Sequence, residues 1–234
     1  MSIYPNGDFL RWIKKKDSFK LYIKKSNNII LENLQSEIIA DNDCALAYFF
    51  AIEFDYKIHL MQKVILDNKN AKYAFLFAQN IKNCDIKALQ KIILNSNSMQ
   101  YICNFACLIP GADQNYLKSF ILKSKNSTYA YKFLKCSKGE DVEKFKKIIL
   151  ISKKPRYLFE LAKYIKNQKD ISNIENLIIE SKSFIYMRMF AAKIKLANVE
   201  KIEQAVLDTD NVKEIKKFAK YVRKSRLRRF FIVL

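Results

Sequence analysis

Hydrophobic positions recur along this chain in blocks of about 28 residues. Each block opens with a segment of the type Tyr-x-x-x-Phe-Ala, and the tyrosines are spaced 28, 28, 28 and 29 residues apart: Tyr73, Tyr101, Tyr129, Tyr157 and Tyr186. Inside a segment the apolar residues follow helical spacing, as Phe77 and Ile81 do after Tyr73. A fixed period of this length predicts a stack of small units, none of which can bury its apolar face alone.

A second helical segment follows in each block after a short turn. Its pattern is clearest in Ile86-x-x-Leu89-x-x-Ile92-Ile93-Leu94. An Asp or Asn precedes this segment in every block: Asp85, Asp113, Asp141, Asp170 and Asn198. Because these side chains accept hydrogen bonds from first-turn amides, we interpret the series as helix N-caps rather than as metal or catalytic carboxylates. A hydroxyl residue ends each second helix and can help to cap the next first helix: Ser96, Ser124, Ser152, Ser181 and Thr209.

This pattern predicts an all-α fold, an α-solenoid of about six to seven short helix–turn–helix repeats. Three Gly and three Pro leave little material for the turns of an all-β protein. We expect N-terminal capping helices and a divergent first repeat in residues 1–43, helical repeats in 44–211, and a basic C-terminal capping helix and tail in 212–234. All three parts are expected to form one structural domain. The repeated tyrosines are interpreted as helix-packing residues.

The short helix–turn–helix unit resembles the HEAT-like family of α-solenoid repeats. The Tyr-x-x-x-Phe-Ala…Gly-Ala-Asp arrangement, clearest from Tyr101 to Asp113, is similar to 28-residue helical repeats of bacterial and phage proteins of unassigned function. The resemblance covers roughly residues 44–219. It implies an architecture, and it leaves the function open because solenoids serve many functions on one scaffold.

Charge is spread unevenly along the chain, which has 43 basic and 23 acidic residues and a net charge of +20. The net charge is +5 in residues 1–25, −4 in 26–69, +10 in 70–154, +1 in 155–211 and +8 in 212–234. Such an excess points to an acidic partner such as nucleic acid, or to a membrane surface. The Lys-, Asn- and Ile-rich composition expected from an AT-rich genome explains part of it, but codon bias alone should spread the lysines more evenly.

The last 23 residues hold the sharpest candidate site. A lysine stripe at i, i+3, i+4, i+7 and i+11 is formed by Lys213, Lys216, Lys217, Lys220 and Lys224. Four of the seven arginines lie within this lysine stripe or after it: Arg223, Arg226, Arg228 and Arg229. Arginine suits bidentate contact with phosphate, so this segment is predicted to bind nucleic acid. The alternative is a solvated end cap that keeps the last repeat soluble.

A second candidate is the polar face of the second helices in the central repeats. Stacked repeats would align its members into one strip, and in solenoids a single face often forms the concave binding surface. The members are Lys87, Lys91, Lys118, Lys144, Lys146, Lys147 and Tyr116. The equivalent positions of the next repeats hold Glu175, Glu200 and Glu203, so a plain solvated face is an equal alternative.

Two further basic groups have structural explanations. Lysines near the ends of the first helices are favoured there by the helix dipole: Lys82, Lys138, Lys166 and Lys195. The N-terminal segment joins Lys14, Lys15, Lys16, Lys20, Lys24 and Lys25 to Phe9, Trp12 and Ile13. It is interpreted as an amphipathic cap over the first repeat, with phosphate binding or membrane-surface contact as the alternative.

No catalytic site, cofactor site or metal site is predicted. The chain has one histidine, His59, and neither a Gly-rich phosphate loop nor a His-Glu-x-x-His motif. Cys103 and Cys107 are four residues apart, but no third ligand accompanies them, and they are expected to be small core residues. The odd number of cysteines argues against a disulfide framework. Without an apolar signal segment or a run of 18 apolar residues, the expected location is the cytoplasm, with no transmembrane segment.

The sequence therefore predicts a non-enzymatic helical-repeat protein whose basic surfaces bind RNA, DNA or a nucleic-acid-containing complex. Membrane-surface binding is not expected. The alternative is a protein-binding modulator or inhibitor of a host ribonucleoprotein complex, for example a phage-encoded counter-defence protein. Some HEAT-like proteins are DNA glycosylases, so the resemblance also implies glycosylase activity as a less favoured alternative. The concave pocket of those enzymes combines aromatic residues with a carboxylate. The single Trp lies at the start of the chain, and the middle repeats show no such cluster.

Overall fold

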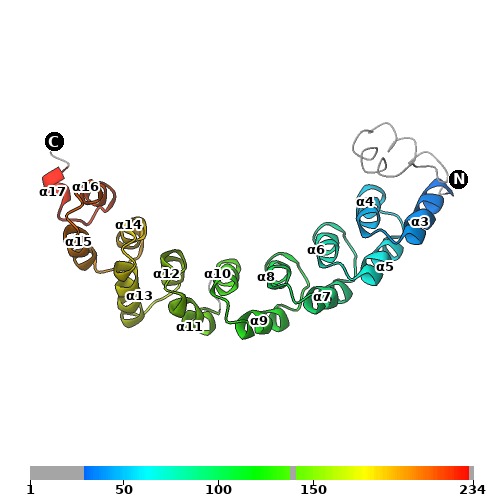
Figure 1. Cartoon of the computed structure of the whole chain (residues 1–234), viewed down its shortest axis with the longest axis horizontal. Helices are drawn as coiled ribbons and strands as arrows, with labels where there is room; N and C mark the ends of the chain where they lie inside the picture. The colour runs from blue at the N-terminus through cyan, green and yellow to red at the C-terminus, as the bar shows by residue number, and fades with distance from the viewer. Residues whose placement is uncertain (1–28, 138–140, 232–234) are drawn as a thin grey trace. The chain divides into compact units, whose positions relative to one another are not determined.

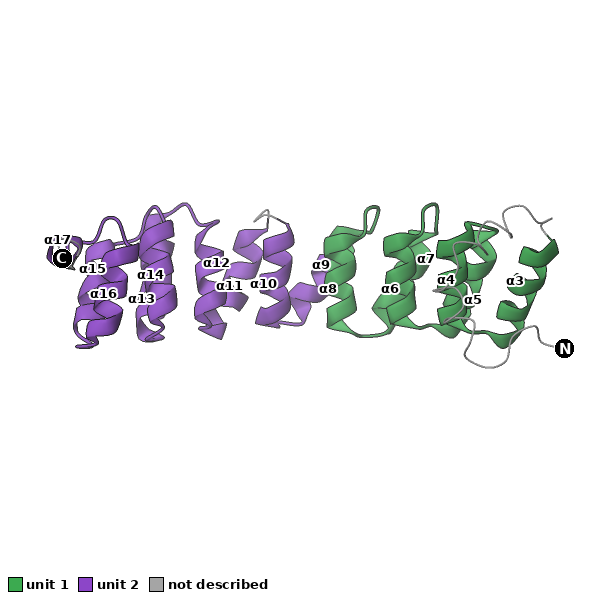
Figure 2. Ribbon diagram, turned by 90° about the horizontal axis from the view of Figure 1, so that it is seen from above, with its two compact units in different colours: residues 1–117 green, residues 118–234 purple. Residues whose placement is uncertain are grey.

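The computed structural model describes residues 29–137 and 141–231, and in these two ranges the chain is helical and contains no strand (Figure 1). Consecutive helices pack against one another as neighbouring pairs, so the predicted all-α solenoid is confirmed. The chain divides into two compact units, Met1–Leu117 and Lys118–Leu234 (Figure 2). Each unit is described by itself below. The N-terminal basic segment around Trp12 lies outside the described residues.

The first unit begins, in its described part, with the second helix of a divergent repeat. Its helices are α3 (Ile29–Asp41), α4 (Cys44–Phe54), α5 (Ile58–Asn68), α6 (Ala71–Asn80), α7 (Ile86–Asn95) and α8 (Met99–Leu108). The helix α9 (Gln114–Lys123) begins in the first unit and ends in the second.

The second unit continues the same alternation. Its further helices are α10 (Ser127–Cys136), α11 (Val142–Ser152), α12 (Pro155–Ala162), α13 (Gln168–Glu180), α14 (Phe184–Lys193), α15 (Val199–Leu207), α16 (Val212–Tyr221) and α17 (Arg228–Phe231). The four-residue α17 lies in the segment that was predicted as a basic tail.

Each unit has two layers of helices. The first helices of the repeats, here called A-helices, are α4, α6 and α8 in the first unit and α10, α12, α14 and α16 in the second; the others, except α17, are B-helices. Neighbouring A-helices pack together more extensively than neighbouring B-helices in both units. The A layer therefore forms the inner side of each unit and the B layer the outer side (Figure 1). The predicted strip of basic residues on the B-helices therefore lies on the outer side of each unit (Figure 1).

The core is built from the repeated aromatic segment. The Phe of each segment is buried, with Leu161 in its place in one repeat: Phe77, Phe105, Phe133, Phe190 and Phe218. Burying one such side chain stabilises the fold by about 1.5–3 kcal/mol. The tyrosines contact a ring on the preceding A-helix, as in the pairs Phe75–Tyr101, Tyr131–Tyr157 and Phe159–Tyr186. Their interpretation as packing residues is confirmed for these pairs.

The hydroxyl residues connect each B-helix to the next A-helix. The Ser96 hydroxyl donates to the carbonyl of Ile93 at 2.6 Å and accepts the amide of Ser98 at 3.2 Å. The same pair of hydrogen bonds, one donated and one accepted by the hydroxyl, occurs at Ser124, Ser152, Ser181 and Thr209. The residue after each hydroxyl has a left-handed backbone with φ of 50–53°: Asn97, Lys125, Lys153, Lys182 and Asp210. These B–A turns repeat without glycine.

The expected N-caps are confirmed at three of five positions. Asp85, Asp113 and Asn198 each accept the amide of the residue three positions later. Asp141 precedes α11 but makes no capping bond, because its carboxylate is turned toward Lys118 and Lys144. Asp170 lies inside the first turn of α13, which begins at Gln168 and is capped by Asn167.

The cysteines divide into two kinds. Cys44, Cys84 and Cys103 form no disulfide, and Cys103 is buried as expected. Cys107 and Cys136 are disulfide-bonded, so the expectation drawn from the odd cysteine number is wrong for these two.

Candidate nucleic-acid interface

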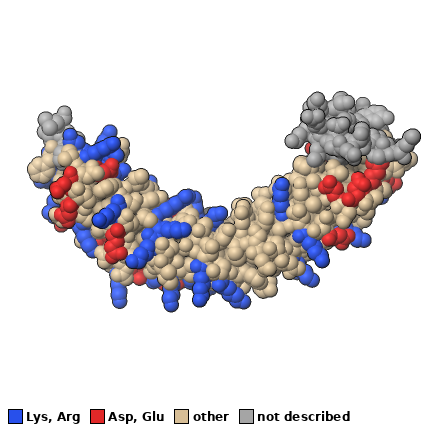
Figure 3. Space-filling model, in the orientation of Figure 1, with Lys and Arg blue, Asp and Glu red and all other residues tan. Residues whose placement is uncertain are grey.

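Most of the positive charge belongs to the second unit. Residues 118–234 contain 29 of the 43 basic and 12 of the 23 acidic residues, which gives a net charge of +17 against +3 for residues 1–117. Basic side chains are visible along the surface of the second unit, including the region of α16 (Figure 3). A candidate interface for a polyanion is therefore to be sought first on this unit.

The helix α16 presents the predicted lysine stripe to solvent. Its apolar residues Ile215, Phe218 and Ala219 are buried against the preceding helices. Lys213, Lys216, Lys220 and Lys224 are exposed. None of these four makes an ion pair with another described residue. They are therefore available to an anionic ligand, which confirms the geometry that the sequence predicted.

Lys217, the remaining member of the stripe, takes part in a local ion-pair cluster. Its ammonium lies 2.7 Å from the carboxylate of Glu214, which also pairs with Arg188 of α14. The hydrogen bond from Lys217, followed by that from Arg188, lowers the pKa of Glu214 against the opposing effect of burial. Lys217 and Arg188 thus hold α16 on α14, and they are less accessible than their exposed neighbours.

The arginine-rich segment after α16 is attached to α15. Ser225 is buried, its hydroxyl donates to Glu203 at 2.5 Å, and the amide of Arg226 donates to the same carboxylate at 2.9 Å. Arg226 also pairs with Glu200 through its guanidinium group. Arg223 and Arg229 are exposed and Arg228 is half-buried. The predicted tail is therefore a folded edge of the last repeat, and Arg226 already has a carboxylate partner.

A column of polar B-helix residues fastens each repeat to the next, and two of the predicted binding lysines belong to it. These clamp residues recur every 27–29 positions: Gln35, Gln62, Gln90, Lys118, Lys146, Glu175 and Glu203. In the first unit, Gln62 and Gln90 accept the amides of Asp85 and Asp113 at 2.9 and 2.8 Å. The side chain therefore reaches the turn before the next B-helix.

In the second unit the same register position carries charge. Lys118 lies 2.8 Å from Asp141, and Lys146 lies 2.7 Å from Asp170. Glu175, only 1 % exposed, accepts the amide of Asn198 at 2.7 Å. The clamp explains why Lys118 and Lys146 are half-buried, and it makes them less available to a ligand than the sequence suggested.

The other members of the predicted B-helix strip are at the surface but are divided between the units. Lys87 and Lys91 of α7 and Tyr116 of α9 are exposed in the first unit. Lys144 and Lys147 of α11 are exposed in the second, and Lys144 pairs with Asp141 at 2.9 Å. Neither unit brings the whole strip together.

The turns that follow the A-helices bring basic residues together at the end of the second unit. A surface hollow of about 420 Å³ lies between the ends of α14 and α16, and it is lined by Lys193, Lys195, Tyr221, Arg223 and Lys224. Lys195 and Arg223 are 28 residues apart, so they occupy the same position in consecutive repeats. The sequence analysis assigned Lys195 to a helix end and missed Lys193 and Tyr221. Comparison of the two turns in register is the signal that finds them.

The other lysines predicted near the ends of the first helices lie at corresponding turns. Lys82 and Lys166 are exposed there, and Lys138 lies outside the described residues.

The A layer of the second unit adds an aromatic and cationic cluster that the sequence analysis also missed. Tyr131 and Tyr157 stack with ring centroids 4.5 Å apart. The guanidinium carbon of Arg156 lies 5.5 Å from the Tyr131 ring centroid, and the Lys154 ammonium lies 5.2 Å from that of Tyr157. Because Tyr131 is buried and stacked on Tyr157, the rings pack α12 on α10, and of this cluster only the cations Lys154 and Arg156 are exposed.

The carboxylates of this layer are engaged. Glu160 on α12 lies 2.7 Å from Lys163, and Glu214 on α16 is held by Lys217 and Arg188. These ion pairs do not match the open carboxylate between aromatic residues that the glycosylase hypothesis requires. Among residues 29–137 and 141–231, no three His, Cys, Asp or Glu side chains come together as they would around a metal ion.

The same described ranges contain no helix with the length and apolar character needed to cross a bilayer. In comparisons with known proteins, no family model, no curated protein and no solved structure matches the chain. Any functional assignment must therefore come from the surfaces of the molecule itself.

Proposed function

We propose that this protein is a non-enzymatic helical-repeat binding protein, with a HEAT-like scaffold, whose second unit binds nucleic acid or a nucleic-acid-containing complex in the cytoplasm. One observation carries the proposal. The exposed cations of α16 and of the adjoining turns, Lys213, Lys216, Lys220, Arg223 and Lys224, are free of carboxylate partners among the described residues. These cations lie together on one helix and the turn that follows it, which is the arrangement that suits a polyanion.

The expected mode of binding is contact with backbone phosphates and little base specificity. Phosphate contacts release condensed counterions, so they supply affinity that depends strongly on salt. Lysine ammonium groups on a rigid helix face can follow a phosphate chain without reading base edges. The net charge of +17 on the second unit would also speed the approach of a polyanion.

The test is a salt titration of affinity. Nuclease-treated, purified protein is mixed with labelled single-stranded RNA, single-stranded DNA and duplex DNA, and anisotropy is measured at several salt concentrations. If about five phosphates are contacted, the logarithm of the association constant for a single strand should fall against the logarithm of salt with a slope of about −3.5. Absence of binding at low salt, or a slope near zero, would contradict the proposal.

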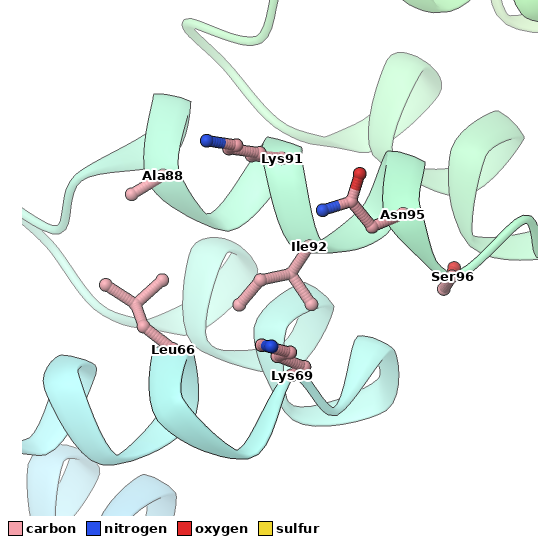
Figure 4. A pocket seen from close by; sticks show the side chains of 7 residues that line it. All are labelled: Leu66, Lys69, Ala88, Lys91, Ile92, Asn95 and Ser96. Carbon is pink, nitrogen blue, oxygen red and sulfur yellow. The ribbon is translucent and has the colours of Figure 1, made fainter.

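A second candidate function has its own observation on the first unit. An apolar hollow of about 380 Å³ lies between the B-helices α5 and α7, where Leu66, Ala88 and Ile92 line it (Figure 4). Lys69 and Lys91 also line this hollow. This combination fits an acidic protein segment that inserts one apolar side chain, as a protein-binding modulator of a host ribonucleoprotein or other protein complex would require.

This second candidate is tested by charge reversal at the hollow. The variant Lys69→Glu/Lys91→Glu should lose a protein partner that the wild-type chain retains from the native host after nuclease treatment. The matched variant Lys125→Glu/Lys182→Glu reverses two exposed lysines of the B–A turns and should retain it. Retention of the same partner by both variants would remove the hollow from the interface.

A further inference from the structure

The hollow between the ends of α14 and α16 concentrates four cations around a small apolar floor. Lys193 is the last residue of α14 and Lys195 lies in the turn after it, whereas Arg223 and Lys224 come from the turn after α16. Ala191 and Ile194 lie beneath them and are buried. A hollow of about 420 Å³ falls in the size range of small-ligand sites, about 300–1,000 Å³.

The helix ends at this hollow do not cancel its charge. The C-terminus of each helix carries about half a negative charge, so α14 and α16 together contribute about −1. The four side chains contribute +4, and none of them pairs with a carboxylate among the described residues. The dipole explanation that fits a single lysine at a helix end therefore accounts for only a quarter of the charge here.

An exposed aromatic ring adjoins these cations. Tyr221 is the last residue of α16, it lines the hollow, and it is 59 % exposed. The ammonium of Lys220 lies 5.6 Å from its ring centroid. The tyrosines of the preceding A-helices are packed against neighbouring rings, whereas Tyr221 presents most of its surface to solvent. A base can stack on such a ring only when it is unpaired.

We propose that this hollow is a nucleotide-binding subsite for single-stranded nucleic acid, in which Lys193, Lys195, Arg223 and Lys224 hold a backbone phosphate and Tyr221 stacks on an adjoining base. The inference rests on the proposed nucleic-acid function and adds the strandedness of the ligand. Arg223 supplies the planar fork that suits two phosphate oxygens, and the three lysines supply charge. Base stacking on tyrosine tolerates any sequence, because every base offers a π-face.

The test compares single-stranded and duplex oligonucleotides of equal length on the full chain. Tyr221→Ala should lower the affinity for a single strand about tenfold and leave the affinity for a duplex within about twofold, because only the single strand offers unpaired bases. Tyr221→Phe keeps the ring and should bind like the wild type. The exposed position of Tyr221 allows both variants to fold, which circular dichroism checks.

The phosphate contacts are tested separately. Arg223→Gln/Lys224→Gln should reduce the slope of log affinity against log salt by about 1.4 for the single strand, since two phosphate-directed charges are removed. Lys125→Gln/Lys182→Gln removes two exposed lysines from the B–A turns at the opposite ends of the repeats and should change the slope by less than about 0.5.

The outcomes separate this inference from the function beneath it. A wild-type chain that binds the single strand with a steep salt slope, while Tyr221→Ala binds it unchanged, would overturn the subsite and leave the proposed function standing. An equal reduction of the salt slope in Arg223→Gln/Lys224→Gln and in Lys125→Gln/Lys182→Gln would also overturn the subsite, since only net charge would then matter. A wild-type chain that binds neither oligonucleotide would refute the function and the subsite together.

Discussion

The ammonium group of Lys118 lies 2.8 Å from the carboxylate of Asp141, in the register position where Gln90 accepts the amide of Asp113. Two different chemistries therefore perform one task, which is to fasten a B-helix to the turn before the next B-helix. Both members of the ion pair are about 15 % exposed, so solvent screens the pair less than it screens a surface pair.

Removal of the lysine should destabilise the protein. Lys118→Ala leaves a poorly hydrated carboxylate without its closest partner, and we expect a loss of about 1–3 kcal/mol in the free energy of unfolding. The matched variant is Lys144→Ala, which removes the exposed partner of the same carboxylate and should cost at most about 1 kcal/mol. Urea unfolding followed by circular dichroism measures both, and equal losses would show that the half-buried position of Lys118 is irrelevant.

The contribution of this pair should disappear in acid. The hydrogen bond from Lys118, followed by that from Lys144, lowers the pKa of Asp141 below its unfolded value of 3.8. The stabilisation is therefore fully present above about pH 4 and is lost as the pH falls through the folded pKa. The difference in stability between wild type and Lys118→Ala should be constant from pH 7 to pH 5 and shrink below pH 4. A difference that persists at low pH would assign the effect to packing of the lysine stem.

Glu175 is a clamp residue whose charge should cost stability. Burial raises its pKa, and the bond from the Asn198 amide and the charge of Lys201 oppose that shift. Glu175→Gln keeps an oxygen for the Asn198 amide, as Gln90 does for Asp113, and removes the buried charge. We expect Glu175→Gln to be as stable as the wild type or more stable at pH 7. Glu175→Ala should lose about 1–3 kcal/mol, because the amide is left unpaired.

The pH dependence of Glu175→Gln has the opposite sign to that of the Asp141 pair. Because the folded pKa is raised, the penalty for the charged form is absent below the unfolded pKa of 4.5 and grows as the pH rises through the folded pKa. Any advantage of Glu175→Gln over the wild type should therefore appear between about pH 4 and neutral pH. A constant difference across this range, measured by urea unfolding at each pH, would contradict the burial of a charged Glu175.

The sequence was sufficient for the scaffold because each repeat restates the same pattern. Five copies of the tyrosine segment outweighed the ambiguity of any one helix, and the A- and B-helices occur where the period placed them. The clamp could not be found in this way, because its register position changes from Gln90 to Lys118 to Glu175 and only the shared geometry reveals one role. The exposure of the α16 lysines followed from helical spacing.

The basic hollow depends on two turns 28 residues apart that meet in space, so no single repeat indicates it and only a comparison of the two turns in register could have done so. The start of α13 was misplaced for a simpler reason, which is that Asn167 and Asp170 are both good N-cap residues. The carboxylate of Asp170 is bound by Lys146 and by Asn167, and this leaves Asn167 to cap the helix.

The capping role of Asn167 can therefore be tested by mutation. Its side-chain oxygen accepts the Asp170 amide at 2.8 Å, and its side-chain nitrogen donates to the Asp170 carboxylate at 2.6 Å. Asn167→Ala should cost about 0.5–2 kcal/mol in unfolding free energy, and Asn167→Asp should lose part of that amount through repulsion from Asp170. An unchanged urea midpoint for Asn167→Ala would place the effective cap elsewhere.

The α16 stripe gives the most direct functional prediction. Lys213→Gln/Lys216→Gln/Lys220→Gln removes three exposed charges while Ile215, Phe218 and Ala219 keep the helix packed, so stability should change by less than about 1 kcal/mol. If each lysine neutralises one phosphate, the slope of log affinity against log salt should become shallower by about 2 for a single strand. Anisotropy titrations at several salt concentrations measure this slope.

The matched control for the stripe removes the same charge from another part of the same unit. Lys125→Gln/Lys153→Gln/Lys182→Gln neutralises three exposed lysines of the B–A turns, where each occupies the left-handed position. Long-range attraction depends on net charge and would weaken equally in both variants, whereas direct phosphate contact would weaken only in the α16 variant. Equal salt slopes in the two variants would therefore show that α16 makes no direct contact and acts only through the field of the whole unit.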